Sequence, residues 1–447
     1  MQTETAIGSE YGRIENVTIV TPGEPVQRDM TIEWVDGVIS AIAPMSVFQV
    51  PPGRSLDTQG AVCIPGLVNT HNHTPLTIVR GMVEDLGFAP AYTPGIPQGH
   101  WLSEEQTLAL SRLGALELLC AGCTTFVDYY RQPAALAKAA IESGQRAFVG
   151  GRVMNVDSGA LASGRFETDR ALGDSTLREA LDMIEAFDGA GDGRITGIHA
   201  PHAGDTCSAD LLSEIARLAS ADGRQVHTHL AQSPLELKHI DARDGCGPVR
   251  LLADAGLLTD KLFAAHCIFL DEEEIVELGR AQATVCHAPL GNAAFGALAP
   301  IKALRDAGAT ITLCTDTKSA DMFESMRMAL AAARIRADGE FVFDADLMLS
   351  WATCDGASAL GMSDVGRIQE GYRADLVVLD ALAANLRPVV DGTGIVVHSG
   401  SASNVQHVFV DGERLVANGQ PTRLDAQDVI DSAQSVADEL WARARHA

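Results

Sequence analysis

The chain has 447 residues, which is long enough for one large domain and a smaller one. Of these residues 46% are hydrophobic and 21% are charged, a composition typical of a globular protein. A formal net charge of −26 argues against nucleic acid and against anionic membrane surfaces as partners. No apolar stretch is long enough to span a bilayer, and the N-terminus shows no signal-peptide pattern.

Short strands are predicted between residue 11 and about residue 60. Ile14–Val20 and Met30–Val35 alternate apolar and polar side chains, and Asp36-Gly37 after the second run is a hairpin-turn signal. From residue 61 the pattern changes to apolar strands that alternate with helical segments. Eight strands are predicted there: Ala61–His71, Thr124–Tyr130, Arg146–Met154, Ile195–His202, Gln225–Ala231, Leu262–Leu270, Ala283–Leu290 and Ala309–Thr317.

Helix starts are marked between these strands. Ser103-Glu-Glu-Gln106 is a capping box that opens a helix ending at Gly122, and Asp271-Glu-Glu-Glu274 opens another in the same way. About eight strands, each followed by a helix, favour a parallel (β/α)8 barrel of the TIM type. The alternative is an open doubly wound sheet, but no Gly-x-Gly-x-x-Gly turn follows a strand to support it.

The pattern returns to short strands near residue 366. Gly371–Asp380 and Val405–Gly412 end in Asp or Asp-Gly turns, and a final helix is predicted at Asp425–Arg445. The two flanking β segments most simply form one module, with the barrel inserted between them. We therefore predict an α/β protein with a composite β-sandwich (1–60 and 367–424), a barrel (61–366) and a C-terminal helix (425–447).

Histidines mark the ends of the predicted barrel strands. His71 and His73 are separated by one residue, so on a strand their side chains point the same way. Two imidazoles on one face can bind a divalent metal ion. In a parallel barrel the chemistry lies at the C-terminal strand ends, which converge. In chain order these ends carry His71, His73, His202, His229, His266, His287 and Asp316.

The strand-end motifs resemble those of the amidohydrolase superfamily. Pro65–His73 is similar to the first-strand motif of that superfamily, and its similarity to the deaminases and chlorohydrolases of N-heterocycles is greatest within it. That group includes S-adenosylhomocysteine deaminases, triazine hydrolases, and cytosine and guanine deaminases. The remaining matching segments are His227-Thr-His229, Ala265-His266-Cys267, Cys314-Thr315-Asp316, the fourth-strand loop from Ala200-Pro-His202 to Cys207-Ser208, and the C-terminal sheet residues 371–380 and 410–412.

The resemblance implies a single divalent metal ion held by His71, His73, His229 and Asp316. Three imidazoles and a carboxylate, completed by water, suit zinc first, with iron, cobalt or manganese as alternatives. Binuclear relatives bridge two metals with a modified lysine on the fourth strand, whereas Ile195–His202 contains no lysine. One metal ion per chain is therefore expected.

The resemblance also implies how the neighbouring residues act. A metal supplies a nucleophile at neutral pH by lowering the pKa of water. Asp316 is expected to accept the proton of that water and pass it toward the leaving group, while His266 orients the water or polarises the electrophile. His202 is expected to contact the substrate. His287 is a second substrate-contact candidate, with core hydrogen bonding as the alternative.

Gln232 departs from the family pattern. The deaminases place a glutamate three residues after the fifth-strand histidine to protonate the ring and the departing amine, but glutamine delivers no proton at ordinary pH. Gln232 is thus expected to bind substrate and assist catalysis. Either the leaving group needs less protonation than an amine does, or Asp316 carries out every proton transfer. A deliberate substitution that traps substrate is a third alternative. The eighth strand also departs, and Lys318 after it either reaches the pocket or is a solvated loop lysine.

The resemblance implies a hydrolase acting on carbon–nitrogen bonds other than peptide bonds, in which activated water attacks a C–N or C–Cl bond of a small N-heterocycle such as an aminated or chlorinated triazine, pyrimidine or purine. One alternative is an acyclic amide, carbamate, thiocarbamate or urea at the same metal site, and a remoter one is a catalytically weakened binding protein. Nine cysteines at irregular spacing predict reduced thiols and a cytoplasmic location. We further expect a homodimer or homotetramer whose partners are a small-molecule substrate and water.

Overall fold

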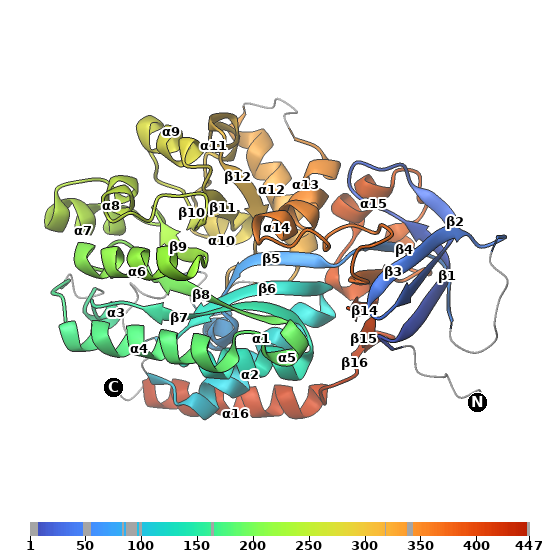
Figure 1. Ribbon diagram of the computed structural model, residues 1–447, viewed down its shortest axis with the longest axis horizontal. Coiled ribbons are helices and arrows are strands. Elements are labelled where there is room, and N and C mark those ends of the chain that lie inside the picture. The colour runs from blue at the N-terminus through green and yellow to red at the C-terminus, as the bar shows by residue number, and fades with distance from the viewer. Residues whose placement is uncertain are drawn as a thin grey trace.

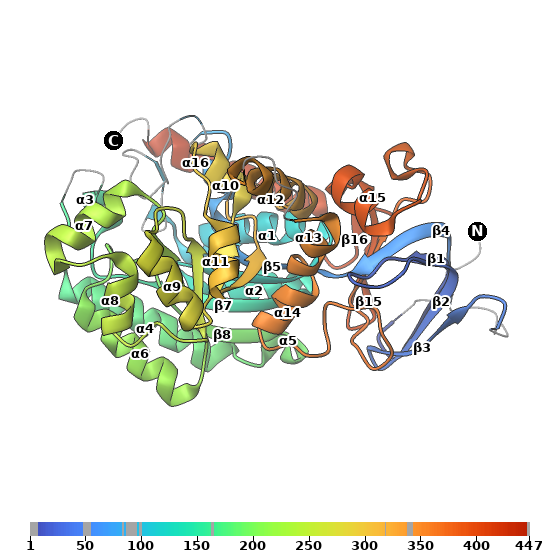
Figure 2. The ribbon, with the colours of Figure 1, turned by 90° about the horizontal axis from the view of Figure 1, so that it is seen from above.

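The computed structural model describes all residues except 1–7, 48–54, 83–84, 86–95, 98–100, 162–164, 318, 338–342 and 445–447. Within the described residues the strands form two sheets of eight, one of them a parallel barrel and the other built from both ends of the chain (Figure 1). Seen from above, the barrel and its helices occupy one side of the molecule and strands β1–β4 the other (Figure 2).

The barrel sheet takes its strands in chain order, from β5 to β12. Neighbouring strands are parallel, and a bridge between Asn72 and Asp316 joins the end of β5 to the segment after β12. This arrangement confirms the predicted (β/α)8 barrel. Its strands are β5 (Leu67–Asn72), β6 (Cys123–Tyr130), β7 (Arg146–Val153), β8 (Ile195–Pro201), β9 (Val226–Leu230), β10 (Leu262–His266), β11 (Thr284–His287) and β12 (Thr310–Leu313).

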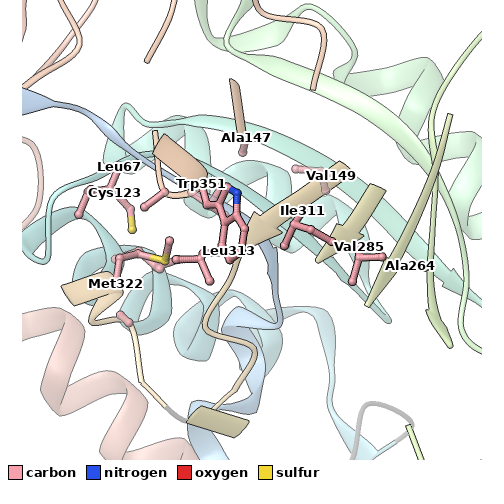
Figure 3. Close-up of a cluster of buried hydrophobic side chains, with 14 of the residues drawn as sticks. Leu67, Cys123, Ala147, Val149, Ala264, Val285, Ile311, Leu313, Met322 and Trp351 are labelled. Atoms are coloured by element: carbon pink, nitrogen blue, oxygen red, sulfur yellow. The ribbon is translucent and has the colours of Figure 1, made fainter. Parts of the chain in front are cut away.

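Helices cover the barrel because successive side chains on a strand point to opposite faces. Val68 and Phe148 pack inside the barrel. Their chain neighbours Leu67 and Val149 belong instead to an outer cluster that also contains Trp351 of α13 (Figure 3). The helices of this part of the chain are η1 (Thr74–Val79), α1 (Glu104–Cys120), α2 (Pro133–Ser143), α3 (Ser158–Leu161), α4 (Arg170–Phe187), α5 (Ala190–Gly193), α6 (Ala209–Asp222), α7 (Pro234–Asp244), α8 (Pro248–Asp254), α9 (Glu272–Arg280), α10 (Pro289–Ala294), α11 (Ile301–Ala307), α12 (Met322–Arg336), α13 (Ala345–Trp351) and α14 (Cys354–Ala359).

Both predicted capping boxes are present. At the start of α1 the Ser103 side chain accepts the Gln106 N–H while the Gln106 side chain accepts the Ser103 N–H, and Asp271 and Glu274 make the same exchange at the start of α9. Each box satisfies backbone donors that have no partner within the helix. The local sequence therefore places these helix starts without help from the rest of the fold.

The second sheet joins the two chain ends in the order β16-β15-β14-β13-β4-β1-β2-β3. Its central strand β4 runs parallel to β1 and antiparallel to β13. Trp34 on β2 and Phe409 on β14 have ring centroids 5.2 Å apart although three strands separate them, so the sheet folds back around a shared core like a sandwich. Its strands are β1 (Tyr11–Ile19), β2 (Gln27–Val35), β3 (Val38–Pro44), β4 (Leu56–Pro65), β13 (Leu376–Leu379), β14 (Val405–Val410), β15 (Glu413–Ala417) and β16 (Gln420–Pro421).

The predicted strand at 61–71 was wrong as a single element. It is split at Gly66, where β4 of the terminal sheet ends and β5 of the barrel begins. A Cβ at this position would lie 2.1 Å from the Thr124 hydroxyl, so only glycine fits at the crossing. The sixth barrel strand is also shorter than predicted and stops at His266, because His266 and Cys267 have φ angles of 74° and 51°.

The remaining C-terminal elements are α15 (Gly392–Ser399), η5 (Ala384–Leu386), η6 (Ala402–Asn404) and α16 (Ala426–Ala444). The last helix packs beside α1 of the barrel, and its Trp441 indole donates to the Ile78 carbonyl at 2.8 Å (Figure 1). No helix among the described residues is both long enough and apolar enough to cross a membrane.

Candidate active site

The barrel gathers the predicted strand-end residues at one end, and all are at most 9% exposed. His71 and His266 lie within β5 and β10, whereas Asp316 lies three residues beyond β12. Gln232 lies two residues beyond β9 and is half-buried. Lys318 lies outside the described residues. The gathered residues are His71, His73, His202, His229, His266, His287 and Asp316.

Four of these side chains form a group that could hold a metal ion. One ligand atom each from His71, His73 and Asp316 lies within 4.8 Å of the others. The Nε2 atoms of His71 and His73 are 3.7 and 4.0 Å from Asp316 Oδ1, and Nε2 of His73 is 3.0 Å from Nε2 of His229. Tetrahedral zinc with ligands at about 2.1 Å sets its ligand atoms roughly 3.4 Å apart. The four residues named from the sequence are thus together at a spacing that suits such an ion.

Backbone carbonyls set the tautomers of two of these histidines. His73 Nδ1–H donates to the Tyr129 carbonyl at 2.8 Å, and His229 Nδ1–H donates to the His202 carbonyl at 2.7 Å. Each bond leaves the lone pair on Nε2, which is the nitrogen that faces the group. His71 Nε2 is buried and has no hydrogen-bond partner among the residues the structure describes. A buried nitrogen of this kind fits a metal ligand.

The same histidines are held in the uncharged form. Burial, with a contribution from Arg152, lowers the pKa of His73 to about 3. Burial also lowers the pKa of His71 and of His229 well below the ordinary value, and neighbouring histidines add to both effects. Neutral imidazole is the form that binds metal, so the site needs no deprotonation at neutral pH before an ion enters.

His266 lies beside this group, and its side chain contacts a residue of α10, the helix that follows the next barrel strand. Its ring stacks on His229 at a centroid distance of 5.4 Å, and one of its nitrogens lies within 4.8 Å of ligand atoms of His71 and His229. Its Nδ1 is 3.0 Å from the amide oxygen of Asn292 on α10. Sequence reasoning gave Asn292 no role, because its contact with His266 exists only once β10 and α10 are packed together.

His202 is also engaged by a residue that the sequence did not single out. Arg152 at the end of β7 donates from Nη2 to His202 Nε2 at 2.6 Å, and His202 Nδ1–H donates to the Thr206 hydroxyl at 2.8 Å. Burial and then Arg152 lower the pKa of His202 well below its ordinary value. The imidazole is therefore neutral and fixed, and its own carbonyl orients His229. Arg152 could have been identified from the sequence, because an arginine at the end of an apolar barrel strand is unusual.

A buried carboxyl group fixes the backbone of Gln232. Glu236 on α7 accepts the N–H of Ala231 at 3.0 Å and the N–H of Gln232 at 2.7 Å. Burial, then the nearby carboxylate of Asp205, raises the pKa of Glu236 to about 8. Ala231 has a φ of 50°, so the chain turns sharply as it leaves β9. The sequence did not identify Glu236 as a support of this turn.

Two other histidines differ in their surroundings. His227 stacks on Phe263 inside the barrel at a centroid distance of 4.2 Å. His287 is 2% exposed and lines a cavity of about 290 Å³ between α11 and α12, bordered by Pro300 and Ala333. Burial, then His266, lowers the pKa of His287 to about 3. Whether His287 touches substrate stays a prediction.

Asp128 on β6 was also missed. It is fully buried and accepts both the hydroxyl and the N–H of Thr74, the residue that follows His73. Burial raises the pKa of Asp128 to about 7, although the bonds from Thr74 act in the opposite direction. A carboxyl group inside an apolar strand was the signal that could have found it. Its effect is to fix the chain as it leaves the two histidines of β5.

The chain matches a known family over most of its length. The model of the amidohydrolase family aligns with residues 62–415, which include every strand of the barrel and the site described above. The chain belongs to the amidohydrolase family. This result confirms the family predicted from the strand-end motifs.

Relatives and solved structures agree with this assignment. A 5-methylthioadenosine/S-adenosylhomocysteine deaminase of Pelotomaculum thermopropionicum is 32% identical over 94% of this amidohydrolase and 96% of its own length. A crystal structure of an adenosine deaminase from Xanthomonas campestris with bound zinc is 26% identical, covers 96% of this chain and 98% of its own, and superposes with a TM-score of 0.82.

A third neighbour supports the fold alone. The zinc complex of an atrazine chlorohydrolase from Arthrobacter aurescens TC1 is 23% identical and covers 95% of this chain and 99% of its own, with a TM-score of 0.81. The named activities of these proteins are deamination and dechlorination, the two reactions of the group predicted from the sequence.

Proposed function

We propose that this amidohydrolase is a mononuclear zinc-dependent hydrolase that removes an exocyclic amine from an aminated N-heterocycle, with adenosine derivatives as the first candidates. The observation that carries the proposal is the convergence of three neutral imidazoles and Asp316 beside His266. The substrate class is taken from the names of the deaminases that match nearly the whole chain.

A single metal ion is favoured by the composition of the fourth strand. β8 contains no lysine that could be modified to bridge two ions. Lys138, which lies between the first and fifth strands in the sequence, is on α2 and binds Glu104 on the surface. His71, His73, His229 and Asp316 would hold the ion, whose Lewis acidity makes water a nucleophile at neutral pH. Elemental analysis that finds two tightly bound ions per chain would overturn this proposal.

The surrounding residues then have separate tasks. Asp316 takes the proton of the attacking water and returns it to the leaving amine. His266 accepts a hydrogen bond from the same water and orients it. Gln232 binds the heterocycle without donating a proton in the reaction, because an amide has no acidic hydrogen at ordinary pH. His202 keeps His229 in place through its carbonyl and accepts a hydrogen bond from the Arg152 guanidinium through Nε2.

The residue at position 232 separates this proposal from its nearest alternative. Chloride or a thiolate leaves as an anion, whereas an amine must be protonated as it departs, so glutamine there also suits a substrate with a good leaving group. Gln232→Glu should raise kcat/KM on amine-leaving heterocycles more than on matched chloro- or thio-heterocycles, within the 10²–10⁴-fold range of general acid catalysis. Gln232→Ala is the control that removes the side chain without adding an acid.

A substrate screen tests the class directly. Zinc-loaded protein should release ammonia from adenosine derivatives and not from ureas, carbamates or simple amides. Turnover of the acyclic compounds alone would replace the proposal with hydrolysis of an acyclic amide, carbamate or urea at the same site. If Gln232→Glu changes kcat/KM equally for amine-leaving and halide-leaving substrates, then Gln232 positions a substrate whose leaving group departs without an acid.

A further inference from the structure

Asn292 makes a buried contact that no part of the proposed mechanism yet uses. It lies on α10, directly after the seventh barrel strand, and is 1% exposed. Its backbone is fixed, because its carbonyl accepts the N–H groups of Phe295 and Ala297 at 3.1 Å each. From this helix its amide oxygen reaches back to the sixth strand and lies 3.0 Å from Nδ1 of His266.

His266 is presented to Asn292 by an uncommon backbone turn. Its φ is 74°, and the N–H of Cys267 donates to the carbonyl of Ala265 at 3.1 Å, so a three-residue turn is centred on His266. A non-glycine residue adopts this conformation only where the surrounding structure enforces it, and such turns gather at functional sites. The imidazole of the residue at the centre of this turn stacks on His229.

The Asn292 contact decides which nitrogen of His266 carries the proton. An amide oxygen only accepts hydrogen bonds, so its partner Nδ1 must carry a proton. Nδ1 is then committed to Asn292, and Nε2 is the nitrogen left for the group formed with His71 and His229. In this tautomer Nε2 has a lone pair that can accept a hydrogen bond from the attacking water.

We infer that Asn292 is a positioning residue that locks His266 in the Nδ1–H tautomer and thereby keeps its Nε2 lone pair toward the attacking water. This inference rests on the proposed role of His266. Asn292 Nδ2 has no hydrogen-bond partner within the described part of the chain, so the contact of Oδ1 with His266 is the polar anchor of this amide. The opposite amide orientation would donate to Nδ1, place the proton on Nε2 and remove the acceptor.

The tautomer can be read directly by ¹⁵N NMR of histidine-labelled protein, with His266 assigned by its loss in His266→Ala. Zinc-loaded wild-type protein should show Nδ1 protonated and Nε2 unprotonated at His266. Asn292→Asp retains an acceptor and should keep this pattern, whereas Asn292→Leu should lose it and populate both tautomers. An Nε2–H signal in wild-type protein overturns the inference, and so does an unchanged Nδ1–H tautomer in Asn292→Leu.

Kinetics test whether the contact matters to turnover. Asn292→Leu should lower kcat about 10- to 100-fold, as is usual for an outer partner of a functional histidine, with KM and bound zinc unchanged. Asn292→Asp should recover part of the rate. Asn404→Ala is the matched control, because Asn404 is a largely buried asparagine in η6, next to the terminal sheet, and its substitution should leave kcat unchanged.

A double-mutant cycle separates failure of this inference from failure of the proposed function. If Asn292 acts through His266, Asn292→Leu should have no further effect on kcat in a His266→Ala background. Equal losses in both backgrounds would show that Asn292 acts independently and would overturn the inference. If His266→Ala itself turns over at the parent rate, the role proposed for His266 fails, while the NMR result still decides which tautomer Asn292 sets.

Discussion

The two ends of the barrel treat buried polar groups in opposite ways. Where the strands end, His71, His73 and His229 are buried and their pKa values are lowered, so they lie uncharged with lone pairs facing one another. Where the strands begin, Arg146 and Arg194 are equally buried but charged and paired. Both bind Asp411 of the terminal sheet, at 2.7 and 2.8 Å, and Arg146 also binds Asp375.

This difference indicates that the end where the strands finish is suited to bind a cation, and that the end where they begin attaches the barrel to the terminal sheet. Neutral imidazoles leave unused lone pairs that a cation can complete, whereas arginine–carboxylate pairs already satisfy each other. Burial by itself would raise the pKa of Asp411, but Arg146, Arg373 and Arg194 together hold it below its ordinary value. We therefore expect changes at the first end to remove activity and changes at the second to remove stability.

The largest effect is expected from His71→Ala. Its Nε2 is buried without a hydrogen-bond partner among the described residues, so alanine should abolish both metal binding and activity while the protein stays folded. Elemental analysis after gel filtration and a turnover assay measure the two losses. Asp411→Asn at the opposite end is the control and should retain its metal. A His71→Ala protein with a full complement of metal would remove His71 from the site.

The next effect tests the opposite end. Asp411→Asn leaves buried arginines short of a carboxylate and should lower the free energy of unfolding by about 3–5 kcal/mol. kcat of the folded enzyme should not change, because Asp411 lies at the far end of the barrel. Asp364→Asn is the matched control: Asp364 pairs with Arg373 at an exposed position, so its loss should cost less than about 1 kcal/mol. Equal costs in denaturant titrations would refute the comparison.

His266→Ala should produce an intermediate effect. Losing the group that we propose to orient the attacking water should lower kcat by roughly 10²-fold, which corresponds to about 2.7 kcal/mol, while the metal content stays unchanged. His199→Ala is the control, because His199 is buried on β8 but bonds Asp222 outside the site. Its substitution should leave kcat unchanged although it also removes a buried imidazole.

The smallest effect, at most about 1.4 kcal/mol per pH unit, is a difference in pH windows between the two ends. His287 has a folded pKa of about 3, so below its unfolded value of about 6.5 the unfolded chain binds a proton that the folded chain refuses. Its stabilising contribution is complete above pH 6.5 and falls away toward pH 3. The lowered pKa of Asp411 gives stability that is complete above about pH 3.9 and lost only below it.

Chemical denaturation of the zinc-loaded protein from pH 4 to 7 measures the first window. His287→Asn should flatten the pH dependence by at most about 1.4 kcal/mol per pH unit. His398→Asn, at an exposed helix position, is the control for loss of a histidine that the fold does not bury. An identical slope in wild type and His287→Asn would show that His287 takes up its proton equally in both states.

Local rules made the barrel and its site predictable. Apolar runs of strand length, caps such as Ser103-Gln106 and the turn at Asp36-Gly37 depend on neighbours in the sequence. The caps and the turn appear in the structure, and the apolar runs form strands, although the run at 61–71 is divided and the run at 262–270 is shortened. The C-terminal ends of parallel strands converge, so histidines at those ends had to meet. The break at Gly66 could not be predicted from local sequence. It is glycine because a Cβ at this position would collide with Thr124 on the neighbouring strand.

By itself, the sequence determined the family, the order of the strands and the residues able to bind a metal, since each of these follows from spacing along one strand or from a motif. Only the tertiary structure decided which partners support those residues. Asn292 reaches His266, Arg152 reaches His202, and Arg146 pairs with Asp375 across 229 positions of the chain. The physical reason is that hydrogen bonds and ion pairs act over about 3 Å, and no periodicity in a sequence records which distant side chains folding brings that close.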